Sequence, residues 1–227
     1  MPGRKTPLVT EHIYHVVNRG VASMPIFLNN SYYQRAIEAF LYYQNQNLSL
    51  RYSYFIRQTQ NKRVEMLDLL RQQSDFLVEI IAYCLMPNHY HLLIKQLTDN
   101  GISTFMSKFA NSYTRFFNTK NKRIGPIFQG KFKSVLIKND NQLLHVSRYI
   151  HLNPFSSNII TNINSLNQYQ YSSYPEYINP NIKSLCHKDI VLSYYKSKNS
   201  YQNFVRDHSD HQRNLQSIKK VMIDFEE

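Results

Sequence analysis

Two histidines, His89 and His91, begin an apolar run that spans residues 88–94. In an extended strand the side chains alternate between faces, so both imidazoles point one way and Tyr90 points the other way, into a core. Two imidazoles side by side form half of a site for a divalent metal ion. Because a His-x-His pair has low specificity on its own, the chemistry depends on what lies beside it.

A second segment with reactive side chains is residues 141–153, which has helical periodicity. Its apolar positions recur on one stripe and are predicted to pack on a sheet: Leu143, Val146 and Ile150. Tyr149 and Asn153 are four residues apart, so they neighbour each other beside that stripe. His145 falls on the same side one turn earlier, whereas His151 falls almost opposite Tyr149.

A tyrosine hydroxyl close to two imidazoles has the groups needed to cut a phosphodiester. The phenol oxygen can attack phosphorus and form a covalent phosphotyrosine, which keeps the bond energy for rejoining the strand. Phenol has a pKa near ~10 and is a weak nucleophile alone. A divalent metal ion would polarise the phosphate and stabilise the leaving oxygen. The ordinary alternatives are that Tyr149 packs in a core and that Asn153, before Pro154, ends a helix.

The identity of the metal follows from the donor atoms. Two imidazoles and one amide oxygen, from His89, His91 and Asn153, leave coordination positions open for phosphate and water. Mg²⁺ prefers oxygen ligands, while imidazole suits Mn²⁺ and later metals better. We therefore expect Mg²⁺ or Mn²⁺ as the cofactor.

The elements that must position these residues follow from the spacing of apolar side chains. Runs rich in β-branched and aromatic residues predict strands at residues 12–19, 76–83, 88–96 and 131–138. Helical periodicity predicts helices at residues 30–47, 103–118 and 141–153, the last ending before Pro154. This order predicts an α+β fold: a ferredoxin-like split βαβ sandwich with a four-stranded antiparallel sheet and an added catalytic helix. The first two helices should cover one sheet face and leave the other free for a site.

Two further segments extend this domain. Residues 50–75 are predicted to be a helical insertion, because their apolar residues give a short amphipathic helix among polar ones. Helical segments are also expected at residues 187–196 and 201–224. We predict a domain over residues 1–178 and a C-terminal helical appendage over residues 179–227, whose role the charges leave open.

The charge of the chain favours a polyanionic partner. Among 227 residues, 27 Lys and Arg outnumber 15 Asp and Glu, a formal charge of +12. Residues 100–139 contain no acidic side chain, and aromatic residues alternate with their cations, as in grooves for single-stranded nucleic acid. The side chains predicted to bind nucleic acid are Arg19, Arg115, Lys122, Arg123, Lys131 and Lys133. Lys131 and Lys133 should share one strand face, with Phe132 facing the core.

Other classes of protein fit the sequence poorly. The two cysteines, Cys84 and Cys186, are too few for a disulfide framework. The first residues lead into no long apolar run, so no signal peptide is expected. No window approaches the ~20 apolar residues of a transmembrane helix. We expect a cytoplasmic protein that does not bind membranes.

Five segments together resemble the single-tyrosine HUH transposases, insertion-sequence enzymes of bacteria that act on single-stranded DNA. Among these, the sequence looks most like the branch called REP-associated tyrosine transposases. The segments are Tyr14–Gly20, Tyr83–Ile94, Phe128–Ser134, Arg148–Pro154 and Tyr171–Tyr174. The resemblance covers roughly residues 8–178, and its motifs are specific in combination.

This resemblance implies a metal-dependent single-stranded DNA endonuclease and strand transferase of transposition, which works through a covalent 5′-phosphotyrosine. His89 and His91 would be the metal ligands, and Tyr149 the nucleophile. Compact members of the family carry Gln as third ligand four residues after the tyrosine. This chain has Asn153 there, one methylene shorter, so His151 or a water is the alternative third ligand.

The resemblance also implies a partner and an assembly. The partner would be single-stranded DNA with a hairpin or palindromic repeat, in the bacterial cytoplasm and at the nucleoid when DNA is bound. A monomer or a homodimer would fit. The insertion and the tail are absent from compact members, and this extra mass implies that Tyr149 acts within its own subunit.

The rival hypothesis is a non-catalytic or domesticated protein of the same fold that binds DNA or RNA hairpins. In such a module, aromatic residues on an open sheet face would stack on bases. The pair His89 and His91 argues against this, because cations or aromatic rings would serve a binding face better.

Overall fold

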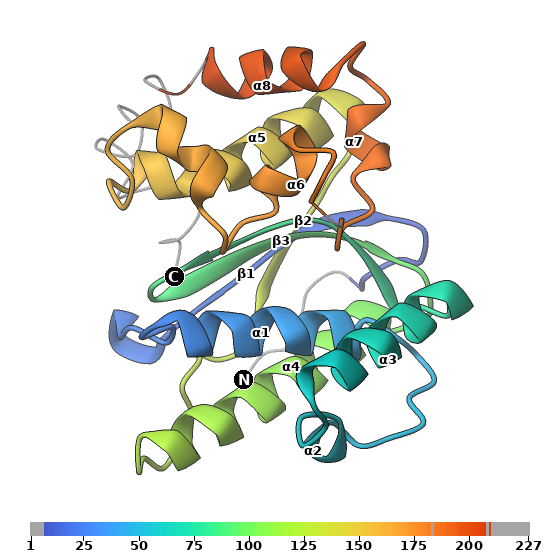
Figure 1. The fold of residues 1–227 in the computed structure, drawn as a ribbon, viewed down its shortest axis with the longest axis vertical. Helices are drawn as coiled ribbons and strands as arrows, with labels where there is room; N and C mark the ends of the chain where they lie inside the picture. The colour runs from blue at the N-terminus through green and yellow to red at the C-terminus, as the bar shows by residue number, and fades with distance from the viewer. Residues whose placement is uncertain (1–6, 183, 208, 210–227) are drawn as a thin grey trace.

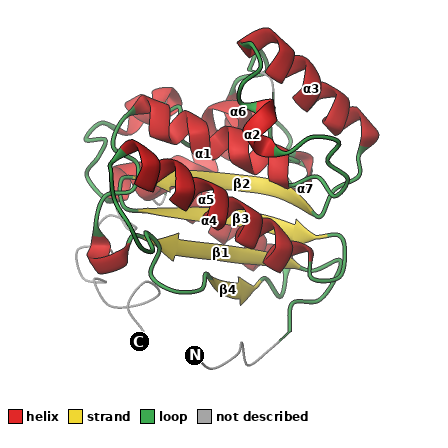
Figure 2. Cartoon of the chain, turned by 90° about the horizontal axis from the view of Figure 1, so that it is seen from below, coloured by secondary structure: helices red, strands yellow, loops and turns green. Residues whose placement is uncertain are grey.

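The structure, a computed structural model, describes residues 7–182, 184–207 and 209. Four strands form one antiparallel sheet in the order β2–β3–β1–β4 (Figure 2). The strands are β1 (Ile13–Arg19), β2 (Val78–Met86), β3 (His89–Gln96) and β4 (Lys133–Leu136). This order and the helices between the strands confirm the predicted ferredoxin-like α+β fold.

One face of the sheet is covered by a layer of helices, drawn below it in Figure 1. The layer consists of α1 (Asn30–Tyr43), α2 (Tyr52–Phe55), α3 (Gln60–Gln73) and α4 (Gly101–Lys120). The alternation in β3 turns Tyr90 toward these helices, where it packs edge to face on Phe40 and Phe109. The first and fourth helices therefore cover this face as predicted, and residues 50–75, the predicted insertion, contain α2 and α3.

The helix α1 ends earlier than its predicted end at residue 47. Its last turn stops at Tyr43 because the following backbone bonds to the segment before β2. Leu77 donates its backbone N–H to the carbonyl of Gln44 at 2.7 Å, and Gln46 donates to Asp75 at 2.9 Å. These bonds use backbone groups that a longer helix would keep within itself.

The other sheet face is not free, contrary to the expectation from the sequence. It is covered by α5 (Asp140–Ser156), a 3₁₀ turn η2 (Ile163–Gln168), α6 (Tyr174–Ile178), α7 (Asp189–Leu192) and α8 (Lys198–Arg206) (Figure 1). Leu143 and Ile150 of α5 share a buried cluster with Cys84 and Leu93 of the sheet. This packing on β2 and β3 is favourable because it removes the apolar stripe of α5 from water.

The helix α5 continues to Ser156, so the predicted end at residue 153 is wrong. Pro154 has no N–H to donate to the carbonyl one turn earlier. The buried side chains of Leu152 and Phe155 nevertheless hold the last turn against the core. The Asn153 side chain also donates a hydrogen bond to the Tyr149 carbonyl at 3.0 Å, within the same helix.

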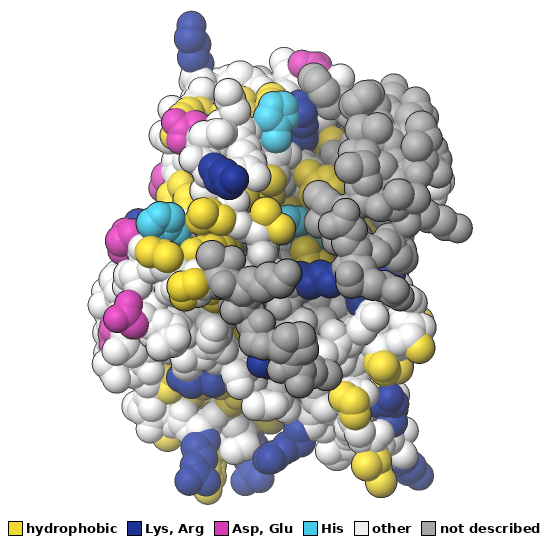
Figure 3. Space-filling view, turned by 180° about the vertical axis from the view of Figure 1, so that it is seen from behind, with side chains coloured by type: hydrophobic (Ala, Val, Ile, Leu, Met, Phe, Trp, Pro, Cys, Tyr) yellow, Lys and Arg dark blue, Asp and Glu magenta, His cyan; other side chains and the backbone are white. Residues whose placement is uncertain are grey.

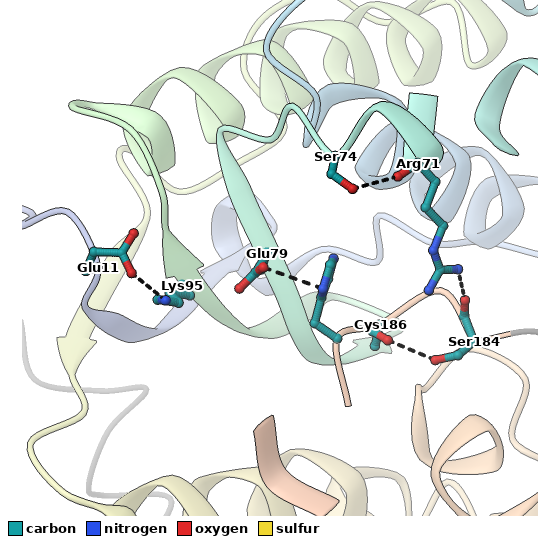
Figure 4. Close-up of polar contacts among 8 residues, drawn as sticks. Glu11, Arg71, Ser74, Glu79, Lys95, Ser184 and Cys186 are labelled. Atoms are coloured by element: carbon teal, nitrogen blue, oxygen red, sulfur yellow. Dashed lines mark hydrogen bonds and ion pairs between the residues drawn. The ribbon is translucent and has the colours of Figure 1, made fainter. Parts of the chain in front are cut away.

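The described part of the C-terminal segment contacts both the sheet and the insertion. Arg71 of α3 donates a hydrogen bond to the carbonyl of Ser184, as Figure 4 shows. Glu79 of β2 lies 3.6 Å from the His187 ring nitrogen Nδ1. The division of the chain at residue 178 stays a prediction, and most of the predicted helix over 201–224 lies outside the described residues. Among the residues described, no helix combines the length and apolarity needed to cross a bilayer.

Candidate active site

The two histidines of the His-x-His pair lie side by side at the head of β3. A two-residue turn, Pro87 and Asn88, joins β2 to β3 and pairs Met86 with His89. The rings of His89 and His91 have centroids 5.0 Å apart and planes at 84° to each other. His91 is fully buried, whereas His89 is half-buried.

Tyr149 of α5 contacts His91 of this pair. Its ring centroid lies 5.4 Å from that of His91, with the two planes at 89°. The helix reaches the strand because its apolar stripe packs on β2 and β3, and Tyr149 lies beside that stripe. A phenol and two imidazoles from distant parts of the sequence therefore meet at one place.

A third histidine, His15 of β1, belongs to the same cluster, and sequence analysis did not single it out. Its Nε2 lies 3.0 Å from Nδ1 of His91, and its ring centroid is 5.9 Å from that of Tyr149. In the sheet Val17 is directly opposite His91, so His15 is the diagonal neighbour on the same face. The alternation of side chains in β1 shows which face His15 is on, but its contact with His91 follows only once the register of β1 against β3 is known.

Burial keeps these imidazoles neutral at pH 7. Desolvation lowers the pKa of His15 to about 4. Desolvation and then the charge of Arg19 lower the pKa of His89 to about 4. The pKa of His91 falls well below its ordinary value because of burial and of the two neighbouring imidazoles. The neutral ring is the form that binds a metal ion.

Two side chains of the site, His89 and His91, have the chemistry to coordinate a divalent metal ion. The Nε2 atom of His91 is buried and has no hydrogen-bond partner among the described residues. A buried polar atom without a partner is costly, and coordination would satisfy this nitrogen. Within the described ranges, no group of three or more His, Cys, Asp or Glu side chains is arranged to hold a metal. His89 and His91 would therefore need an amide, a phosphate or water to complete the shell.

The candidates for the third ligand differ in their surroundings. Asn153 is 1% exposed, one turn after Tyr149, and its Nδ2 points to the Tyr149 carbonyl, which leaves its Oδ1 as the acceptor atom. His151 uses both ring nitrogens elsewhere: Nδ1 lies 2.7 Å from the Tyr201 hydroxyl and Nε2 2.8 Å from Ser173 Oγ. Both ring nitrogens of His151 are therefore engaged with Tyr201 and Ser173, and neither is available as a metal ligand.

The remaining histidine of α5, His145, contacts Arg148 and Phe204. Its Nδ1 accepts a hydrogen bond from Arg148 at 2.7 Å, and its ring centroid is 5.9 Å from that of Phe204 in α8. The sequence placed His145 on the side of Tyr149, one turn earlier, and its ring also contacts Phe204 of α8.

Some of the predicted nucleic-acid contacts lie close to the histidines. Arg19 is directly opposite His89 in the sheet, and Lys133 is directly opposite Val17, so both cations share the face of the histidines. Lys131 precedes β4, and Phe132 packs on the core below the sheet as predicted.

The other predicted cations lie in the opposite layer. Arg115 on α4 and Arg123 after it line an open polar groove of about 710 Å³. The remaining lining residues are polar or small: Asn111, Thr114, Asn118, Thr119, Gly125 and Pro126. Lys122 lies in the same turn, and Arg123 is held by the carbonyl of Pro126 at 2.9 Å. The space-filling view shows Lys and Arg side chains along the lower part of the molecule (Figure 3).

The fold and the site define a class of protein: a ferredoxin-like α+β sandwich in which two strand imidazoles meet a helix phenol. Residues 48–153 match the family described as "Transposase IS200 like". That range contains His89, His91, Tyr149 and Asn153. This match confirms the resemblance that the motifs predicted, and it supports a role in DNA transposition.

A solved structure of a REP-associated tyrosine transposase bound to a REP hairpin is similar to this chain. The alignment covers 82% of this chain and 90% of that chain, with a TM-score of 0.53 and 13% sequence identity. At this identity the likeness concerns the fold. No curated protein matches the sequence.

Proposed function

We propose that the protein is a single-stranded DNA endonuclease and strand transferase that uses Tyr149 as its nucleophile. One observation carries the proposal: the Tyr149 ring packs against His91, whose Nε2 is buried without a hydrogen-bond partner among the described residues. A phenol next to a metal-ready imidazole is the arrangement that phosphodiester transfer through tyrosine requires. The match to a transposase family supports this chemistry.

In the proposed reaction, the Tyr149 hydroxyl oxygen forms a bond to phosphorus and the bond from phosphorus to the 3′ oxygen breaks. The proton that the phenol loses is matched by the one that the 3′ oxygen gains. The products are a 5′-phosphotyrosine and a free 3′-hydroxyl, and attack by a 3′-hydroxyl reverses the step. A bound Mg²⁺ or Mn²⁺, held by His89, His91 and Asn153, would polarise the phosphate and stabilise the leaving oxygen.

Two groups of cations would hold the DNA. Arg19, Lys131 and Lys133 would contact phosphates near the reacting bond, since Arg19 and Lys133 share the face of the histidines. Arg115, Lys122 and Arg123 would bind the phosphates of a folded hairpin on the α4 groove. The hairpin bound to the similar transposase structure supports a substrate of this kind. Tyr149 would act within its own subunit, because it already contacts the histidines of its own chain.

The rival hypothesis of a base-stacking sheet has less support. It needs an open sheet face with exposed aromatic rings. Here α1 and α4 pack on one face and α5 packs on the other (Figure 1). A non-catalytic hairpin binder on the α4 groove remains the alternative, and covalent chemistry separates the two.

Tyr149→Phe tests the proposal, because it removes one oxygen and keeps the ring. A labelled hairpin with a single-stranded flank is incubated with Mn²⁺ and then boiled in detergent. Wild type should give a cut strand and a detergent-resistant protein–DNA band, and the variant should give neither while binding the hairpin within about twofold of wild type. A Tyr149→Phe protein that cuts at the full rate would refute the nucleophile. Tyr54→Phe, at a 53% exposed position on α2, is the matched control and should cut normally.

A further inference from the structure

His15 and His91 form a hydrogen-bonded pair of imidazoles inside the protein. Their facing nitrogens, Nε2 of His15 and Nδ1 of His91, are 3.0 Å apart. The ring centroids are 5.2 Å apart and the planes differ by only 20°. Because the nitrogens are so much closer than the centroids, the rings meet edge to edge and nearly in one plane. That is the geometry in which an N–H points at the lone pair of a ring nitrogen.

The direction of this hydrogen bond decides what His91 can bind. A neutral imidazole has one N–H donor and one lone-pair acceptor. If His15 donated, His91 would carry its own proton on Nε2, and a buried N–H would be left without an acceptor. If His91 donates from Nδ1, its Nε2 has a free lone pair. Only the second arrangement leaves the buried, unpartnered Nε2 able to coordinate a metal ion.

We propose that His15 is a positioning residue that accepts the Nδ1 proton of His91 and so fixes the tautomer and the ring orientation of that ligand. The inference rests on the proposed function, in which His91 holds the metal. His15 is 4% exposed, and its Nε2 is already used by His91, so it is not itself placed to coordinate. Tyr149 packs edge-on against both rings, which limits their rotation.

The strand register explains why position 15 has this role. Long side chains at diagonal positions of neighbouring strands come within contact, and His15 is diagonal to His91. The residue directly opposite His91 is Val17, which has no polar atom. The sheet therefore places one imidazole where it can hold another, and the pair needs no side chain from α5.

The first test measures the tautomer directly. The full-length chain is labelled with ¹⁵N at histidine, and long-range ¹H–¹⁵N spectra are recorded without metal or DNA. We expect His91 to carry its proton on Nδ1 and to show an unprotonated Nε2. A proton on Nε2 of His91 would overturn the inference. This measurement needs no variant and no activity.

The second test measures Mn²⁺ affinity by calorimetry without DNA. His15→Phe keeps a flat ring but has no acceptor, and affinity should fall roughly 10- to 100-fold, as for other residues that orient a metal ligand. In His15→Gln the side-chain oxygen can take the place of Nε2, so most of the affinity should return. Equal weakening in both variants, or none in His15→Phe, would overturn the inference.

A third variant separates this inference from the proposed function. If His91→Ala binds Mn²⁺ as tightly as wild type, the ligand role of His91 fails and the inference fails with it. If His91→Ala loses affinity while His15→Phe keeps it, only the role of His15 fails. Thermal unfolding of each variant shows whether the fold is retained, and the tautomer measurement on wild type decides the matter if His15→Phe unfolds.

Discussion

The two ring nitrogens of His91 have different surroundings, and this difference organises the candidate site. Nδ1 faces His15 at 3.0 Å, while Nε2 is buried with no partner among the described residues. A structural histidine in the same helix layer looks different, since His151 has a hydrogen-bonding neighbour at each nitrogen. A metal-binding histidine is expected to have a hydrogen-bond partner at one ring nitrogen and none at the nitrogen that coordinates the metal.

The environment of His151 predicts how stability depends on pH. Desolvation lowers its pKa to about 3 in the folded protein. The unfolded chain takes up a proton below pH ~6.5, while the folded protein does not until pH falls much further. Stability should therefore be unaffected above pH 6.5 and should fall as pH drops from there toward 3. Between pH 8 and pH 5 this single group should cost about 2 kcal/mol.

The variant His151→Gln removes the titrating ring, so it isolates this contribution. Urea unfolding at pH 8 gives the cost of the lost packing, and unfolding at pH 5 gives the pH effect. We expect the variant to lose about 2 kcal/mol less than wild type between the two pH values. If both proteins lose the same free energy, the buried neutral state of His151 is wrong.

At the scale of single elements, α5 shows what the sequence predicts and what it does not. Its apolar stripe correctly predicted that Leu143 and Ile150 pack on the sheet, because helical spacing determines which side chains share a face. Its end was predicted too early, because burial of Phe155 outweighs the backbone bond lost at Pro154. The contact of His15 with His91 depends on the register between β1 and β3, and spacing within one strand does not contain that register.

The start of α5 provides a prediction about stability. Asn139 is the N-cap, and its side chain accepts a hydrogen bond from the backbone N–H of Gln142 at 2.9 Å. Asn139→Ala removes that acceptor and should lower the free energy of unfolding by about 1 kcal/mol. For a chain of this length, this corresponds to a fall in Tm of roughly 2–4 °C.

Asn139→Asp is the control, since it keeps a side-chain acceptor and adds a negative charge at the helix N-terminus. It should match or exceed the wild-type stability in urea unfolding. The cap has no role in stability if Asn139→Ala and Asn139→Asp unfold at the same urea concentration as wild type.

At the scale of the whole molecule, the sheet separates two basic regions. Arg19 and Lys133 share the face of the histidines, whereas Arg115 and Arg123 line the groove on the α4 side. The sequence predicted the cations but not this separation, because a run of charge within residues 100–139 does not show which layer each residue joins. A substrate with a folded part and a single-stranded part would use both regions, with only the single strand entering the site.

This division predicts that binding of the hairpin and cutting of the strand can be changed separately. Arg115→Gln should weaken hairpin binding several-fold and reduce the slope of log K against log salt by about 0.9, the value of one duplex phosphate contact. A short strand without a hairpin should still be cut at the wild-type rate when it is saturating.

Lys133→Gln should instead slow the cutting of both substrates, because that cation lies on the sheet face of the histidines, where Tyr149 packs. Lys62→Gln on α3 removes one positive charge at an exposed position. It should leave the hairpin affinity, its salt dependence and the cutting rate unchanged. Equal effects of Arg115→Gln on both substrates would mean that the groove does not bind the hairpin.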